Sequence, residues 1–203
     1  MDKPTKEYLQ KLIEKTREKF DNFSNHFSDV SNFQITYVST KKRNLAGIIK
    51  GIRGLMEMKI YNNKESNKIS PNCKSYNKFY KVGDKIQKIE CFVGGHNDLD
   101  IIYIAQYDEN SCYLFPFFSN LNKAIGYPII VTHFLNGDVV EEYRVDGNKI
   151  FYEKYGYSMR DKVEYYCINF VPTGKCPILG EEYGFFDTKT LEYRQVSNKV
   201  WFK

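Results

Sequence analysis

The residues best suited to chemistry lie close together near the middle of the chain. Asp98 and Asp100 are two residues apart, and His96 comes just before them. Side chains at positions i and i+2 of a β-strand lie on the same face, so carboxylates with this spacing can hold Mg²⁺ together. One interpretation is therefore a nucleotide- or nucleic-acid-processing enzyme that uses His96, Asp98 and Asp100 as its catalytic residues.

The same segment, VGGHNDLDI, superficially resembles the nucleotidyltransferase signature, in which a Gly-Gly or Gly-Ser pair precedes Asp-x-Asp. That family separates the two parts by a helical turn or more, whereas only His96 and Asn97 intervene here. Gly, Asn and Asp are typical of turns, so we interpret residues 94–98 as a hairpin loop. The chain also lacks the phosphate-binding, zinc-protease and serine-hydrolase motifs, and the sequence favours a binding protein over an enzyme.

A second candidate site comes from the tyrosines, of which the chain has 17, beside 15 phenylalanines. Twelve of the 17 lie between residues 101 and 203, and in segments 149–157 and 162–170 they occupy both alternating faces. With a single predicted helix as cover, we expect some of these rings to be exposed and to form a protein-docking face flanked by glutamates. The predicted partner-binding residues are Tyr143, Tyr152, Tyr165, Glu141, Glu142, Glu153 and Glu164.

The net charge of +5 comes from the first half of the chain. Residues 1–100 hold 19 Lys and Arg against 12 Asp and Glu, whereas residues 101–203 hold 11 against 13. A basic stretch runs from Lys41 to Lys59, but most tyrosines lie in the acidic half. Because nucleic-acid binding on a sheet needs cations and aromatic rings together, we do not expect nucleic acid as the partner.

The cysteines and hydropathy indicate a cytoplasmic protein. The five cysteines are irregularly spaced, no apolar run approaches the roughly 20 residues of a membrane span, and the first residues do not resemble a signal peptide. We therefore expect reduced, mostly buried thiols and no membrane partner. Zinc ligands with local spacing are absent, the nearest pair being Cys91 and His96, so we expect no metal and no cofactor.

One helix is predicted near the N-terminus, where apolar residues recur every three to four positions from Tyr8 to Phe23. Pro4 suits the first helical position, and Asp2 suits the cap. Residues 33–38 alternate like a half-buried strand, and residues 45–61 fit either a helix or, as we prefer, a bent strand pair. Further predicted strands are residues 77–82, 87–93, 100–107, 112–118, 128–134, 139–145, 149–157, 162–170, 182–186, 191–196 and 199–202.

Short turns between these strands predict antiparallel neighbours. Asn136-Gly137 and Asp146-Gly147 are typical of type I′ hairpin turns, and Pro116 should end or bulge its strand. The predicted fold class is α+β, with an N-terminal amphipathic helix packed on a large, mostly antiparallel β-meander sheet. We expect a single domain, 1–203, in which residues 1–44 supply the helix and one strand and residues 45–203 supply the meander.

Residues 132–157, THFLNGDVVEEYRVDGNKIFYEKYGY, resemble YwqK-type antitoxins and MORN-like β-hairpin arrays in their Asn-Gly turns and Glu-Tyr pairs. More loosely, a helix followed by a long antiparallel sheet is similar to immunity proteins of bacterial polymorphic-toxin and contact-dependent inhibition systems. The resemblance implies a cytosolic interaction protein that binds and neutralises a cognate toxin domain. It leaves the identity of the toxin and the oligomeric state open.

Overall fold

The computed structural model describes residues 2–24, 32–40, 48, 65–94, 98–159, 162–173, 178–187, 189–190 and 192–200. The ambiguous segment 45–61 lies outside these ranges except for Ile48, which is buried. Whether that segment is a helix or a strand pair therefore stays a prediction.

The chain forms two compact units, which are described separately below. Unit 1 comprises Met1–Phe23 and Pro128–Lys203, and unit 2 comprises Ser24–Tyr127. Unit 2 contains 14 Lys and Arg against 9 Asp and Glu, whereas unit 1 contains 16 of each. The whole net charge of +5 thus belongs to unit 2.

Unit 1 begins with helix α1, Lys6–Asn22. Thr5, and not the predicted Asp2, caps the helix, because its side-chain oxygen accepts a hydrogen bond from the backbone N–H of Tyr8 at 3.1 Å. Pro4 accordingly lies before the helix. The predicted apolar face is confirmed, since its buried residues are Leu9, Leu12, Ile13, Thr16 and Phe20.

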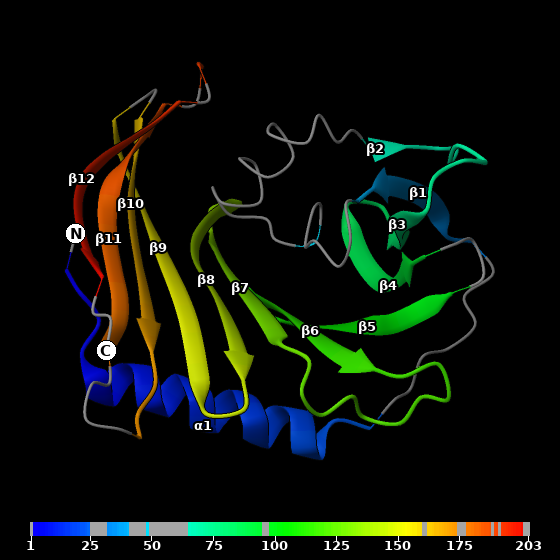
Figure 1. Ribbon diagram of the computed structural model, residues 1–203, viewed down its shortest axis with the longest axis horizontal. Coiled ribbons are helices and arrows are strands. Elements are labelled where there is room, and N and C mark those ends of the chain that lie inside the picture. The colour runs from blue at the N-terminus through cyan, green and yellow to red at the C-terminus, as the bar shows by residue number, and fades with distance from the viewer. Residues whose placement is uncertain are drawn as a thin grey trace. The chain divides into compact units, whose positions relative to one another are not determined.

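The sheet of unit 1 has the strand order β12-β11-β10-β9-β8-β7, with every strand antiparallel to its sequence neighbour (Figure 1). The described parts of the predicted strands 191–196 and 199–202 belong to one strand, β12, whose register against β11 shifts between Tyr183 and Gly184. The strand bounds are β7 Ile129–Leu135, β8 Asp138–Asp146, β9 Lys149–Met159, β10 Lys162–Phe170, β11 Ile178–Asp187 and β12 Glu192–Val200.

Helix α1 runs across the strands of unit 1 and contacts β8 and β9 (Figure 1). The ring of Tyr8 meets that of Tyr152 edge-on, with 6.2 Å between centroids. Near the other end of the helix, Arg17 Nη1 donates to Asn148 Oδ1 at 2.6 Å. Polar contacts near both ends of α1 therefore flank its buried apolar face.

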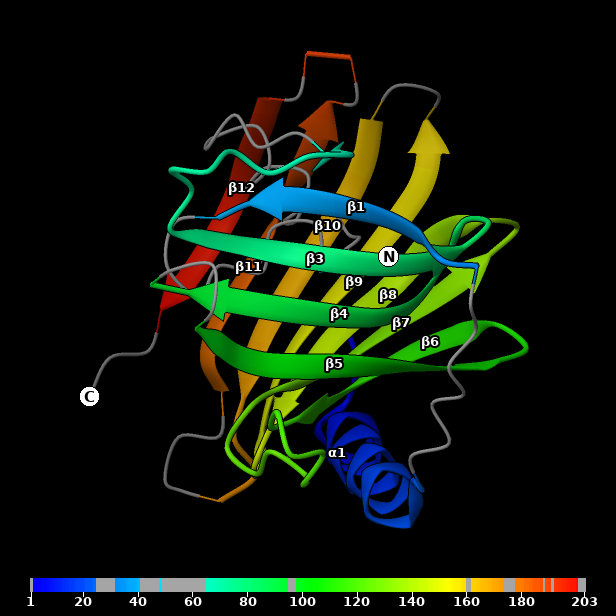
Figure 2. The same cartoon turned by 90° about the vertical axis from the view of Figure 1, so that its right-hand side faces the viewer.

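Unit 2 has the strand order β6-β5-β4-β3-β1-β2, again with antiparallel pairs throughout (Figure 2). The short strand β2 was not predicted. Strand β6 runs one residue past Pro116 and pairs with β5 without a register shift, so the strand ends there rather than bulging. The bounds are β1 Gln34–Ser39, β2 Glu65–Ser66, β3 Ser75–Val82, β4 Lys85–Val93, β5 Leu99–Asp108 and β6 Ser111–Phe117.

These elements confirm the predicted α+β class and the antiparallel meander. In the described part of the chain, all strand pairs within each unit are antiparallel, and α1 is the one helix. No helix among the described residues has the length and apolar character needed to cross a membrane.

One of the two predicted type I′ turns is confirmed. Asn136 and Gly137 join β7 to β8 with φ values of 53° and 88°, both positive as this turn requires. Between β8 and β9, Asp146 pairs with Lys149, which leaves Gly147 and Asn148 as the turn residues. The predicted pair Asp146-Gly147 was therefore wrong by one position, and only Gly147 of the two turn residues has a positive φ, 54°.

Replacing Gly137 with Ala should lower the free energy of unfolding by about 1–2 kcal/mol, because a Cβ is disfavoured at positive φ. Nothing lies within 4 Å of the added Cβ, so the effect reports backbone conformation alone. Gly180→Ala in β11 is the control, since that position has equal space and no positive φ. Urea unfolding measures both, and equal effects of the two substitutions would contradict the assignment.

Candidate functional site

The tyrosines predicted to bind a partner are buried, and the expectation that they are exposed is wrong. Tyr143, Tyr152 and Tyr165 have 2%, 0% and 5% of their surface exposed. Of the predicted glutamates, Glu142 and Glu153 are each only 1% exposed. Both faces of β8, β9 and β10 are packed, so these rings have no surface to offer a partner.

On the face of the sheet that contacts α1, tyrosine hydroxyls converge on Glu141. Tyr152 donates to Glu141 Oε1 at 2.7 Å, and Tyr8 of the helix donates to Glu141 Oε2 at 3.0 Å. Tyr143 stacks against Tyr152 with a centroid distance of 6.4 Å. Burial, followed by the charge of Glu141, raises the pKa of Tyr152 well above its usual value. The predicted docking residues on this face therefore bind the helix.

The opposite face has a similar arrangement around Glu153. Tyr165 donates to Glu153 Oε1 at 3.0 Å, and Tyr155 donates to Glu153 Oε2 at 3.1 Å. Glu142 is the cross-strand neighbour of Glu153 and accepts a hydrogen bond from Thr132 at 3.1 Å. Burial, followed by the charge of Glu153, raises the pKa of Tyr155 and Tyr165 far above the ordinary value. These side-chain hydrogen bonds link β7 to β8 and β9 to β10.

The last predicted docking residue, Glu164 on β10, is half-buried. It accepts a hydrogen bond from Tyr183 of β11 at 3.3 Å, and its Oε2 lies 3.0 Å from where a Cβ on Gly156 would be. The carboxylate therefore fills the space that this glycine leaves open.

Asp98 and Asp100 do not share a strand face, and the catalytic interpretation that joins them to His96 stays a prediction. Asp98 is exposed and precedes β5, where its carbonyl accepts a hydrogen bond from the N–H of Val93 and closes the predicted hairpin loop. Asp100 lies at a register shift in β5 and accepts a hydrogen bond from Tyr127 at 3.0 Å. The same-face argument fails because Asp98 is outside the strand, and His96 lies outside the described residues.

The described residues contain no group of three His, Cys, Asp or Glu side chains that could hold a metal ion. Cys91, Cys112 and Cys167 are buried free thiols, and Cys73 is half-buried. Burial raises the pKa of the Cys91 thiol far above its usual value. A thiol of this kind packs as a small apolar side chain and is a poor nucleophile.

Lysines and aromatic rings do lie together in unit 2, contrary to the expectation that they are separated along the chain. On β3 and β4 the ammonium groups of Lys88 and Lys78 lie 4.1 and 4.7 Å from the ring centroid of Tyr80. Glu90 accepts a hydrogen bond from the Tyr80 hydroxyl at 2.7 Å. It also forms ion pairs with Lys88 at 2.9 Å and with Lys78 at 3.8 Å. Both cations therefore share one carboxylate, which offsets one of their two positive charges.

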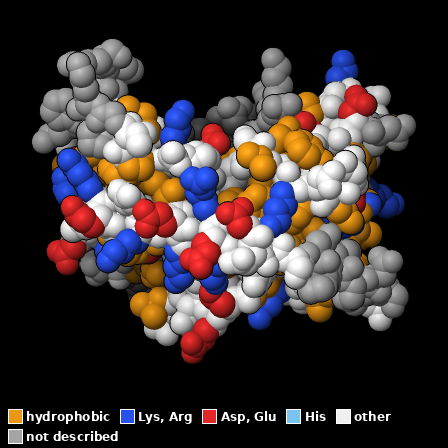
Figure 3. All heavy atoms as spheres, turned by 90° about the horizontal axis from the view of Figure 1, so that it is seen from below, with side chains coloured by type: hydrophobic (Ala, Val, Ile, Leu, Met, Phe, Trp, Pro, Cys, Tyr) orange, Lys and Arg blue, Asp and Glu red, His pale blue; other side chains and the backbone are white. Residues whose placement is uncertain are grey.

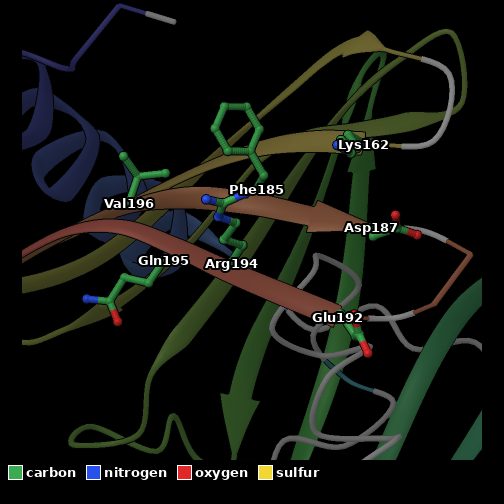
Figure 4. Close-up of a pocket in the computed structure, with 7 residues that line it drawn as sticks. All are labelled: Lys162, Phe185, Asp187, Glu192, Arg194, Gln195 and Val196. Carbon is green, nitrogen blue, oxygen red and sulfur yellow. The ribbon is translucent and has the colours of Figure 1, made fainter.

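A hollow of about 700 Å³ lies at the end of the sheet of unit 1, on β10, β11 and β12. Figure 4 shows Phe185, Arg194 and Val196 on one side of the strands and Gln195 on the other. Its two cations, Lys162 and Arg194, are matched by the carboxylates of Asp187 and Glu192. Because the lining carries balanced charge, it selects neither an anion nor a cation.

The outward face of α1 alternates in charge. Its exposed residues include Lys6, Glu7, Lys11, Glu14 and Lys15. In the space-filling view from below, blue and red side chains are interspersed over this face (Figure 3). Such a mixed surface is typical of a solvated helix and produces no strong field of one sign.

Among the described residues of unit 2, the two most exposed large apolar side chains, Leu121 and Ile125, lie on the loop of residues 118–127, which follows β6. Phe118, Leu121 and Ile125 have 39%, 51% and 87% of their surface exposed. No periodic pattern marks this segment in the sequence, where Leu121 stands between Asn120 and Asn122 in a turn-rich stretch. We call this segment the apolar loop.

No protein-family model matches the chain, and neither a curated protein nor a solved structure matches it significantly. Assignment of function therefore rests on the chain's own residues.

The buried tyrosines predict a decline in stability at high pH. Tyr152, Tyr155 and Tyr165 have raised pKa values in the folded chain, whereas in the unfolded chain tyrosine loses its proton near pH 10. Their contribution to the free energy of unfolding is complete below about pH 10. It is lost as the pH rises towards their pKa values in the folded chain, and each tyrosine then costs up to about 1.4 kcal/mol for every pH unit.

Urea unfolding at pH 8 to 11 measures this decline. Tyr165→Phe should be less stable at pH 8, because Glu153 loses a donor, and should show a shallower decline above pH 10. A decline of equal slope in the variant would contradict the assignment, since lysines also titrate in this range.

Proposed function

We propose that this protein is an interaction protein, specifically an immunity protein that binds and neutralises a cognate bacterial toxin in the cytoplasm. The observation that carries the proposal is the apolar loop, which exposes three large apolar side chains within eight residues. Large apolar side chains that are exposed together on one segment are typical of protein-interaction sites. The resemblance of residues 132–157 to antitoxin hairpin arrays supports the same class.

The loop replaces the buried tyrosines as the docking surface. Its backbone is fixed by internal hydrogen bonds, among them Phe118 N–H to Asn122 O at 2.9 Å and Ala124 N–H to Pro116 O at 3.0 Å. Ala124 is fully buried and ties the loop to its unit. Because the loop is already ordered, binding through it needs little further loss of conformational entropy.

Competing functions have weaker support in the described residues. An Asp-x-Asp enzyme needs two converging carboxylates, whereas Asp98 is exposed and Asp100 is engaged with Tyr127. Nucleic-acid binding needs free cations beside free ring faces, whereas Lys78 and Lys88 contact both Tyr80 and Glu90. Neither arrangement matches its chemistry as well as the apolar loop matches protein docking.

The test begins with the gene directly upstream of this chain's gene: it should encode a toxin domain, and the two proteins are then produced together. Absence of a toxin gene there would count against the proposal. The wild-type chain should restore growth and bind a catalytically inactive form of that domain in calorimetry. Ile125→Glu should weaken binding at least about tenfold, since a charge replaces an 87% exposed anchor. Val82→Glu is the matched control, because Val82 is a 48% exposed apolar residue elsewhere in unit 2.

Failure of the wild-type chain to bind or protect would refute the proposal. Salt-sensitive binding of a labelled RNA or DNA 20-mer that is lost in Lys88→Gln would instead support nucleic-acid binding.

A further inference from the structure

We propose that the apolar loop and Asp98 with Asp100 form one docking surface for a protein cleft with an apolar floor and a rim of Lys and Arg. This inference rests on the proposed function, because it specifies the partner's chemistry for the same loop. It also assigns a role to the two aspartates, which do not form a metal site.

The first argument is the backbone of Leu121, whose φ is +62°. A branched side chain is disfavoured in this left-handed region, where Gly and Asn are the usual residues. Asn120 and Asn122 flank Leu121, so a residue suited to the position lies one place away on either side. The Leu121 side chain is 51% exposed and contributes little to a core. The backbone conformation at this position disfavours Leu, and the side chain adds little to core packing. We therefore infer that Leu121 contacts another molecule.

The second argument is the order of the loop. Leu121 N–H donates to Phe118 O at 2.9 Å, and Asn122 N–H donates to the side chain of Asn120 at 3.1 Å. The rings of Phe118 and Tyr127 meet edge-on at 6.0 Å. These contacts present the apolar side chains in a fixed arrangement, as a preorganised binding loop requires.

The third argument is local charge. Tyr127, the last residue of the loop, donates to Asp100 at 3.0 Å, which places the start of β5 beside the loop. Residues 98–100 and 118–127 contain two aspartates and one cation, Lys123, within a unit whose net charge is positive. Asp98, two residues before Asp100 in the chain, is exposed. An acidic border around apolar anchors is complementary to a basic rim around an apolar cleft.

Two other occupants fit these charges poorly. Loops that enter bilayers pair apolar side chains with Lys and Arg, which bind anionic lipids, whereas this loop is bordered by aspartates. A second copy of the chain, related by a two-fold axis at the loop, would bring like-charged aspartates together.

The sharpest test is Leu121→Asn, because a docking role and a structural role predict opposite results. Asn adopts positive φ readily, so the urea midpoint of the variant should equal or exceed that of the wild-type chain. Its affinity for the inactive upstream-encoded toxin domain should fall at least about tenfold in calorimetry, because an apolar anchor is lost. Val82→Asn, the control in unit 2, should keep wild-type affinity.

The acidic border is tested by Asp98→Asn in stopped-flow binding. Its association rate constant with the same domain should fall about threefold at low ionic strength, with the dissociation rate unchanged. Asp84→Asn in the β3–β4 turn, an exposed aspartate of the same unit, is the control and should have no effect.

The outcomes separate this inference from the proposed function. If the wild-type chain does not bind, both fail. If it binds and Ile125→Glu weakens binding, but Leu121→Asn and Asp98→Asn bind as the wild-type chain does, only this inference is overturned. Leu121-dependent flotation with anionic vesicles, or Leu121-dependent dimers in sedimentation, would also overturn it in favour of the bilayer or the second copy.

Discussion

The burial of carboxylates beneath tyrosine hydroxyls is the interaction on which unit 1 depends. Glu142 and Glu153 are directly opposed on β8 and β9, and each is 1% exposed. A carboxyl group at such depth is tolerated only if hydrogen-bond partners replace its lost hydration. Tyr155 and Tyr165 supply these hydrogen bonds to Glu153, one to each oxygen. The abundant tyrosine therefore serves the interior of the sheet, and the alternation of Glu and Tyr along these strands is a structural pattern.

This arrangement explains which parts of the chain were predictable. Strand β10 has the predicted bounds, residues 162–170, because alternation and adjacent turns are local signals. The burial of Tyr143 and Tyr165 was not predictable, because it depends on what covers each face of the sheet. Contacts between residues distant in sequence decide that cover. The helix start was wrong for a related reason: Asp2, Pro4 and Thr5 all suit a helix start, and geometry selected Thr5.

The candidate site shows the same division. Asp98 and Asp100 are notable for their spacing, but Asp98 lies before β5, so the two do not share the strand face on which that argument rested. Leu121 has no distinctive spacing, and its unusual feature is a backbone angle that sequence does not report. The positive charge was correctly traced to the first half of the chain. Its position beside Tyr80 and Glu90 depended on the register of the β3–β4 hairpin, which decides which side chains face one another.

The register shift in β12 has a consequence for the behaviour of the protein at high concentration. As the last strand of its sheet, β12 pairs with β11 on one side only, and a nine-residue edge strand is a template on which a further chain can add. Opposite Tyr183 and Gly184, however, Val196 is an extra residue in the ladder. Such a bulge interrupts the regular row of N–H and C=O groups along the edge. The sheet can therefore end in a long strand without starting a fibre.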